Sequence, residues 1–219
     1  MRYTFTAIAA LSLLAGTGCS AVDVEINAYR SELPFPGPDA HVYVEAIALE
    51  EPALLSRELR QLVVRELESR GYKCVDNPDE AGVVISCTAG IDSGHTVVEN
   101  VPRSEVYYGT THTYGRHGFV GIGYSWGTGT TYVPESYREF DRRLMVTMAD
   151  AKLLGNLPDE KDETAIIWEA NAVSTGASRD LRRILRYLLA AVFDHFGRNT
   201  LQAVHHSYSE DDDSVRRFE

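Results

Sequence analysis

The sequence is poor in basic residues, in cysteine and in long apolar runs, and each shortage excludes a class of protein. Its 21 lysines and arginines are outnumbered by 32 aspartates and glutamates, which gives a formal net charge of −11. A chain this acidic does not attract nucleic acid or an anionic membrane surface through its charge. Its N-terminal apolar run, Ala7 to Ala15, is too short to span a bilayer, and no later run approaches that length. We therefore expect no nucleic-acid partner and no transmembrane helix.

The N-terminus has the features of a bacterial secretion signal. Met1 and Arg2 give a positive start, the apolar run follows, and small residues from Gly16 lead into Cys19. This pattern resembles a lipobox, although Gly16 stands where such boxes usually carry leucine. It predicts a lipoprotein signal peptide over residues 1–18, acylation of Cys19 and a stable anchor in the lipid bilayer, since two or more acyl chains hold firmly. Ordinary secretion with cleavage after Ala21 is the alternative.

By the same resemblance, Ser20 after the cysteine favours sorting to the outer membrane. The expected location is the cell envelope, at the periplasmic face of the outer membrane. Removal of Arg2 with the leader changes the formal charge from −11 to −12. The remaining chain of roughly 200 residues is long enough for one domain with a real core.

Three cysteines are present, and acylation of Cys19 would leave Cys74 and Cys87 in an oxidising compartment. Both lie in strand-like runs. A disulfide between them requires Cβ atoms within about 4 Å of each other. We favour two buried thiols packed as small apolar groups, with the disulfide as the alternative.

Two amphipathic helices are predicted with clear boundaries. The first lies between Pro52 and Gly71, with leucines on one face and Glu66 and Arg70 spaced to form an i,i+4 pair. The second begins after a cap at Ser178 and continues for more than four turns before Gly197. Short apolar or alternating runs predict strands at 41–49, 72–75, 83–89, 137–148 and 166–172.

These elements predict an α+β fold of two layers, with an antiparallel or mixed sheet covered on one face by the two helices. The expected single domain covers residues 41–200. Residues 19–40 are rich in proline and are interpreted as a lipidated tether with an irregular lead-in, or as an irregular first strand. Residues 201–219, with acidic residues from Glu210 to Asp213, are predicted to be a disordered tail.

The order of these features resembles a family of uncharacterised Gram-negative envelope lipoproteins, one of the domain-of-unknown-function families. The resemblance rests on a helix ending in Arg70-Gly71-Tyr72, on Glu80-Ala81 before an apolar strand, and on a Gly/Tyr-rich middle. A strand ending in Ala149-Asp150, an Ile167-Trp168 strand and a closing amphipathic helix complete it. Two departures are Ala81-Gly82 in place of Ala-Asp and Glu169-Ala170 where glycine often follows the tryptophan. The resemblance implies an envelope role without known catalysis.

Gly123-Tyr124-Ser125-Trp126-Gly127 matches the G-x-S-x-G pattern of a hydrolase nucleophile elbow. That motif needs a helix directly after the serine, and the sequence continues instead with glycine and threonine. A periplasmic serine hydrolase using Ser125 is therefore kept only as an alternative to a protein without enzymatic activity. Loop histidines at 95, 112 and 117 match no known metal-ligand spacing, so no metal or other cofactor is expected.

The segment 107–132 is the strongest candidate for a functional region. Aromatic residues interrupt a background of glycine and threonine, which predicts either a long twisted hairpin or a flexible loop. Aromatic side chains give a large contact area at a low cost in conformational entropy. We expect a non-enzymatic binding or envelope-assembly factor whose partner is an envelope protein, peptidoglycan or a glycan; a structural lipoprotein without a specific ligand is the further alternative. The expected binding residues are Tyr114, Phe119, Tyr124, Trp126 and Tyr132.

Overall fold

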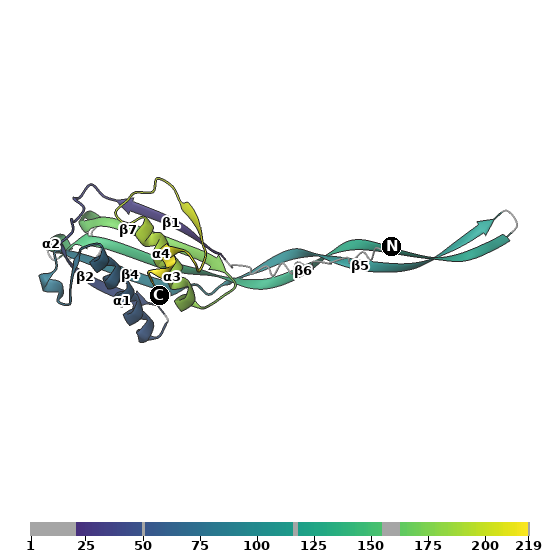
Figure 1. Ribbon diagram of the computed structural model, residues 1–219, viewed down its shortest axis with the longest axis horizontal. Coiled ribbons are helices and arrows are strands. Elements are labelled where there is room, and N and C mark those ends of the chain that lie inside the picture. The colour runs from purple at the N-terminus through teal and green to yellow at the C-terminus, as the bar shows by residue number, and fades with distance from the viewer. Residues whose placement is uncertain (1–20, 50, 116–117, 155–162, 219) are drawn as a thin grey trace, which may run out of the picture.

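The computed structural model describes residues 21–49, 51–115, 118–154 and 163–218, and between 108 and 126 it describes the backbone alone. The fold is a mixed sheet with helices on one face, as the sequence predicted for an α+β chain (Figure 1). The strand order is β3-β2-β4-β6-β7-β1-β8, with β5 paired to β6 outside this path. The strands are β1 (Val22–Arg30), β2 (His41–Ala48), β3 (Lys73–Val75), β4 (Val83–Ile91), β5 (His95–Gly115), β6 (Gly118–Asp150), β7 (Ile166–Gly176) and β8 (Val204–Tyr208).

Strand β2 lies parallel to both β3 and β4, and the other pairings are antiparallel. The parallel pairing arises because α1 connects β2 to β3, and a crossover connection returns the chain in the same direction. Register is fixed by the alternation of buried and exposed residues along each strand. In β6, for example, Leu144, Val146 and Met148 are buried toward the helices.

The helices are α1 (Ala53–Ser69), α2 (Ala151–Leu154), α3 (Leu181–Asp194) and α4 (Asp213–Arg216), with 3-10 turns at Pro78–Glu80 and Glu163–Ala165. Helix α1 lies on β2 and β3, and α3 lies on β1, β6 and β7. The predicted i,i+4 pair of α1 is present, with Glu66 and Arg70 2.7 Å apart. The cap of α3 is Asp180 rather than the predicted Ser178, because its carboxylate accepts the backbone N–H of Arg183. Gly197 ends the segment at φ 71°, as predicted.

The core lies between the sheet and these two helices. Alanines on the inner face of the sheet, such as Ala28, Ala170 and Ala172, are fully buried and let α3 approach closely. Trp168 is also fully buried, as expected for its place on the apolar face, and its indole N–H donates to the Arg198 carbonyl at 3.0 Å. None of the described helices is long and apolar enough to cross a membrane.

The structure corrects the predictions for both ends of the chain. Residues 22–30 form a regular strand of the sheet rather than a tether or an irregular strand, because β1 lies between β7 and β8 and buries Val24, Ile26 and Ala28. The segment predicted as a disordered tail contains β8 and α4, and it buries Tyr208, Val215 and Phe218. These three apolar side chains, spread among acidic neighbours, supply the burial that orders it. The domain therefore begins near Val22 and continues to Phe218.

Candidate functional site: the β5–β6 arm

A long two-stranded ribbon, which we call the arm, projects from one end of the domain (Figure 1). It consists of β5 paired antiparallel with residues 118–139 of β6, from His95–Glu139 to Gly115–Gly118, with a register shift between Thr113 and Tyr114. From Phe140 onward β6 turns into the domain sheet, where it pairs with β4 and β7. Among the described strands none pairs with the outer edge of β5. The predicted long hairpin is thus present, and it is longer than residues 107–132.

The arm joins the domain through a tight connection. Gly94 has φ 74°, and a Cβ atom there would lie 2.6 Å from the ring of Phe140 and 2.8 Å from the Glu139 carbonyl oxygen. Glycine is required here because the φ angle is positive and because no space is left for a Cβ atom. The carboxylate of Asp92 accepts the backbone N–H groups of Gly94 and Asp141 at 3.0 and 2.9 Å. These contacts fix the direction in which the arm leaves the sheet.

Charged side chains at the domain end of this connection form hydrogen bonds that stabilise it. Arg142 is only 3% exposed, and its guanidinium donates to the carbonyls of Ser174 and Ser178, each at 3.0 Å. Thr175 donates a hydrogen bond of 2.7 Å to Asp141, whose other oxygen accepts from Arg143. The Thr175 bond and then the Arg143 guanidinium lower the pKa of Asp141 below its usual range. The root of the arm is therefore held by many hydrogen bonds to the domain, whereas along the arm β5 pairs, among the described strands, with β6 alone.

The two faces of the arm differ in charge. One face, which we call the uncharged face, carries the even-numbered residues of both strands, since paired residues share a face and alternate residues return to it. Between residues 96–106 and 128–136 it has no charged side chain; Arg138 lies at its root. Val98 is 65% exposed, Val106 51% and Tyr132 66%. Large apolar side chains are therefore exposed to solvent on an uncharged surface that twists with the ribbon (Figure 1).

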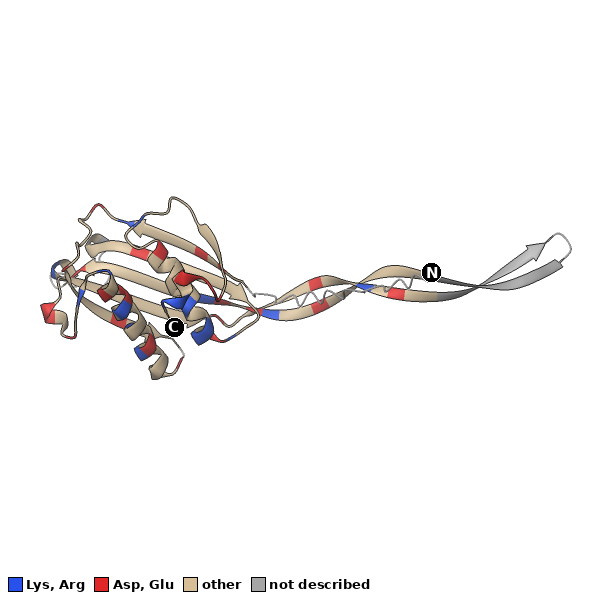
Figure 2. Ribbon diagram, in the orientation of Figure 1, with Lys and Arg blue, Asp and Glu red and all other residues tan. Residues whose placement is uncertain are grey.

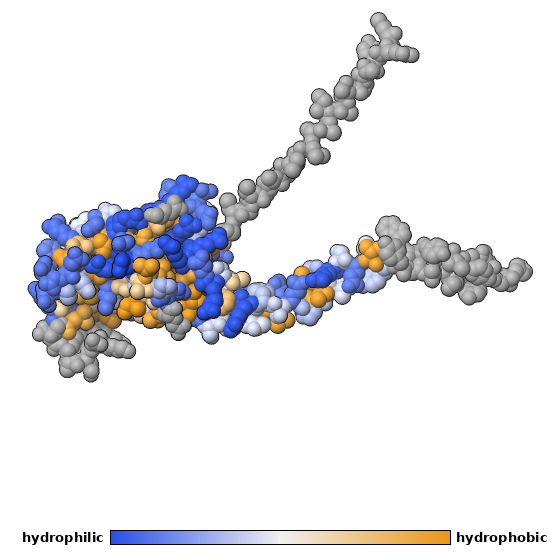
Figure 3. Space-filling view, turned by 90° about the horizontal axis from the view of Figure 1, so that it is seen from below, coloured by the Kyte–Doolittle hydropathy of each residue, from blue (hydrophilic) through white to orange (hydrophobic). Residues whose placement is uncertain are grey.

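The opposite face carries the charges of the described arm apart from Arg138. Arg103 forms an ion pair with Glu135 at 2.6 Å. The hydroxyl of Tyr107 donates to Glu105 at 2.9 Å, and its ring lies where a side chain on Gly129 would otherwise be. Several polar groups of this face therefore bond to one another, and among the described side chains of the uncharged face no such hydrogen bond or ion pair is found. Figure 2 shows the charges concentrated on the domain with a few along the arm, and Figure 3 shows the pale and orange residues of the described arm.

Of the predicted binding residues, Tyr132 is described in full and lies on the uncharged face opposite Pro102. The backbone places Tyr114, Phe119, Tyr124 and Trp126 in the distal arm, and their side chains lie outside the described residues. The same holds for the side chain of Ser125. Its backbone is continuous strand paired with Gly109, so the strand-to-helix turn that a nucleophile elbow requires is not found along the described backbone of β6.

The other predicted sites have separate outcomes. Cys19 lies outside the described residues. Cys74 and Cys87 are free, and the alternative of a disulfide was wrong because β2 separates their strands. Two strand spacings amount to about 9.5 Å, too far for a bridge. Burial raises the pKa of the Cys74 thiol to about 11 and that of Cys87 to about 12, so both behave as apolar groups. His95 pairs with Glu139 at the arm root.

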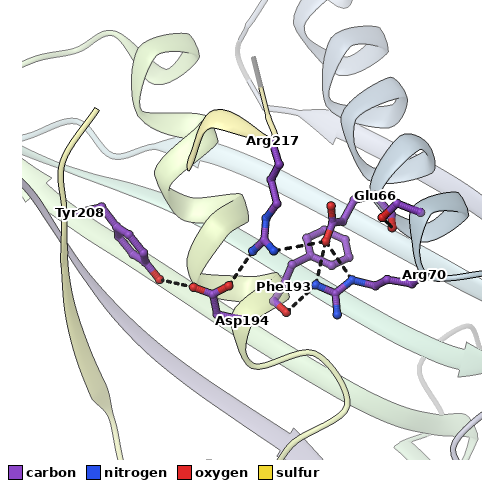
Figure 4. Close-up of polar contacts among 7 residues, drawn as sticks. Glu66, Arg70, Phe193, Asp194, Tyr208 and Arg217 are labelled. Atoms are coloured by element: carbon purple, nitrogen blue, oxygen red, sulfur yellow. Dashed lines mark hydrogen bonds and ion pairs between the residues drawn. The ribbon is translucent and has the colours of Figure 1, made fainter. Parts of the chain in front are cut away.

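A second polar cluster lies away from the arm, where the C-terminal segment closes over the helices (Figure 4). Arg217 contacts Asp194 at 2.6 Å and Glu66 at 3.7 Å, and Arg70 donates to both Glu66 and the Phe193 carbonyl. The hydroxyl of Tyr208 donates to Asp194 at 3.1 Å. Both carboxylates are neutralised by arginine, so the cluster fastens α1, α3 and the C-terminal segment together.

Next to this cluster two histidines meet. His195, at the C-terminal end of α3, and His206, on β8, place their Nε2 atoms 2.8 Å apart. The ring of His206 stacks on Tyr208, with ring centres 5.5 Å apart. Burial and then the neighbouring His206 lower the pKa of His195. Sequence analysis missed this pair because residues 201–219 were predicted to be disordered; the alternation of Val204, His206 and Tyr208 was the signal for a strand.

Comparisons with known proteins give one family match and likenesses to solved structures at low sequence identity. The chain is similar to a PDZ domain protein from Parabacteroides distasonis ATCC 8503, with 11% identity and a TM-score of 0.41 over 86% of this chain and 40% of that one. It is also similar to the PelC dodecamer protein from Paraburkholderia phytofirmans, with 14% identity and a TM-score of 0.40 over 80% of this chain and 99% of that one. No curated protein sequence matches. Residues 41–196 match the model of the domain of unknown function DUF4136, and the chain therefore belongs to the DUF4136 family.

Proposed function

We propose that this protein is a non-enzymatic binding factor of the Gram-negative cell envelope, whose arm engages another envelope protein. The observation that carries the proposal is the uncharged face, on which Val98, Val106 and Tyr132 are 65, 51 and 66% exposed. Protein interfaces are depleted in charge at their centre, as this face is between residues 96–106 and 128–136, and tyrosine, present here as Tyr132, is a residue type that they favour. A ribbon of two strands is also marginally stable in water on its own. A partner that covers the face would stabilise it.

The face, rather than an edge of the ribbon, is the proposed contact surface. Pro102 lies in β5 and Pro134 in β6, so each strand of the described arm contains a residue without a backbone N–H group. Proline in an exposed strand discourages the addition of another strand at the edge. A glycan fits less well, since sugar recognition needs several placed polar groups, and the large exposed side chains here are apolar. These features favour a protein partner that packs on side chains.

A lipid anchor at Cys19 would place this binding arm at the periplasmic side of the outer membrane. The support is the sequence pattern of a charged start, a short apolar run and small residues before Cys19. With two or more acyl chains the anchor would hold stably. Anchoring at one site and binding through an arm at another suits a factor that assembles or maintains envelope structures.

Site-specific photo-crosslinking in living cells tests the proposal. A crosslinking amino acid at Tyr132 or Val98 is expected to capture one protein reproducibly, and the same amino acid at Tyr107 is the matched control. Tyr107 is also an exposed tyrosine of the arm, but it lies on the charged face and bonds to Glu105. The proposal fails if positions 98 and 132 capture nothing, or if position 107 captures the same protein equally well.

The anchor is tested separately by intact mass and membrane partitioning, with wild type beside Cys19→Ala. A mature mass that begins at Cys19 and includes acyl chains, lost in the variant, is the expected result. A soluble product that begins after Ala21 would instead show a secreted protein, and the arm would then act without a membrane tether.

A further inference from the structure

We propose that His195 and His206 form a binding site for a divalent transition-metal cation that prefers imidazole, of the Zn²⁺ and Cu²⁺ class. This inference is independent of the arm and of the proposed function. The two residues come from different elements, the end of α3 and strand β8, and their Nε2 atoms point at each other across 2.8 Å. At this distance the Nε2–H group of one neutral imidazole donates to the Nε2 atom of the other, which acts only as an acceptor. A cation can instead use the lone pairs of both.

The distance between the nitrogens is close to what a metal requires. Zinc binds imidazole nitrogen at about 2.0–2.1 Å, so two ligands in a tetrahedral arrangement lie about 3.3 Å apart. The rings need to separate by about 0.5 Å from the distance given above, which a small side-chain rotation supplies. Both histidines are half-buried, which leaves one side open for water. Among the described residues no third His, Cys, Asp or Glu completes a ligand group, so water fills the remaining positions.

The surroundings favour a cation overall. His195 caps the C-terminal end of α3, where the unpaired carbonyl groups make the helix end negative. Asp194 adds a carboxylate nearby, although Arg217 pairs with it, and Arg198 acts in the opposite direction on His195. His205 is directed away from the site, since it is 76% exposed and pairs with Glu25 at 3.7 Å.

The pair is held in place by its neighbours. The ring of Tyr208 stacks on that of His206. Its hydroxyl donates a hydrogen bond to Asp194, the residue before His195, and so fastens β8 to the end of α3 (Figure 4). Metal ligands are commonly oriented by such outer contacts, whose loss lowers affinity about 10–100-fold. The two histidines are therefore held close to each other before a metal binds.

The test is a titration of the purified full chain with Zn²⁺ in competition with a chromophoric chelator at pH 7.5. Wild type is expected to bind one equivalent tightly, and His195→Gln and His206→Gln are each expected to bind at least tenfold more weakly. The matched control, His205→Gln, changes the adjacent histidine and should retain wild-type affinity. Circular dichroism without metal confirms folding; should one variant fail to fold, the other still decides.

Copper gives an independent readout at the same site. The electron paramagnetic resonance spectrum of one equivalent of Cu²⁺ is expected to show two nitrogen ligands in wild type and in His205→Gln, and fewer in His195→Gln. Equal zinc affinity in wild type and both site variants would overturn the proposal. So would an equal loss in His205→Gln, because the metal would then bind the exposed histidines of β8.

Discussion

The domain and the arm share strand β6 and use apolar side chains in opposite ways. Within the domain, Leu144, Val146 and Met148 of β6 are fully buried between the sheet and the helices. In the arm, Val98 and Tyr132 remain about two-thirds exposed. Burial of a large aliphatic side chain such as these contributes roughly 1.5–3 kcal/mol to the stability of the domain. The arm depends on its backbone ladder and cross-strand pairs, so stability lies in the domain and exposed contact surface lies in the arm.

The largest contrast is expected between Trp168→Ala and Tyr132→Ala. Trp168 is fully buried and donates to the Arg198 carbonyl, so its truncation should lower the free energy of unfolding by about 3–5 kcal/mol. Tyr132 packs on little of the domain, and its truncation should change that free energy by less than about 0.5 kcal/mol. Urea unfolding of both variants measures the difference. Equal losses would mean that the arm contributes to the stability of the fold.

A smaller effect is expected at the junction of the two regions. Gly94→Ala places a Cβ atom 2.6 Å from the Phe140 ring at a positive φ, which should cost about 1–3 kcal/mol and alter the direction of the arm. Gly127→Ala is the control within the arm, because a Cβ atom there meets nothing within 4 Å. Urea midpoints and amide exchange of β5 provide the measurements. Similar values for the two variants would show that the junction is not tightly packed.

The smallest expected effect concerns Asp141, just inside the junction. Its pKa is lowered chiefly by the hydrogen bond from Thr175, so the ionised carboxylate stabilises the fold at neutral pH. That contribution is lost as the pH falls below the ordinary value of 3.8 and through the lowered pKa of the folded state. Thr175→Val should raise the pKa of Asp141 and weaken this acid dependence. An NMR titration of the carboxyl carbon checks it, and an unchanged pKa would assign the shift to Arg143.

Elements with a strong local pattern could be predicted from the sequence. The leucine face between Pro52 and Gly71 gave α1 (Ala53–Ser69), and the apolar series ending at Gly197 gave α3. The cap of α3 was misplaced because Ser178 and Asp180 are both good capping residues, and only the geometry selects Asp180. The ribbon was expected as one of two alternatives, since glycine-rich aromatic segments also form loops.

Elements that depend on distant partners could not be predicted. Strand β1 joins a proline-rich segment, and it pairs with β7 and β8, which lie far along the chain. The C-terminal segment has few apolar residues, and it is ordered by burial of Tyr208, Val215 and Phe218 together with the contacts of Arg217 and Tyr208 to Asp194 of α3. The His195–His206 pair follows from that same docking. Likewise, the uncharged face of the arm became visible only once the register of β5 on β6 was known.

Strand β6 is continuous from Gly118 to Asp150 and runs into the sheet between β4 and β7. A pulling force on the arm, directed along its length, is therefore transmitted to an interior strand of the domain rather than to a surface loop. The hydrogen bonds that β6 makes to β4 and β7 lie across the strand direction, so such a load shears many of them at once instead of opening them one by one. The junction between the arm and the domain is therefore built to resist a force applied along the arm.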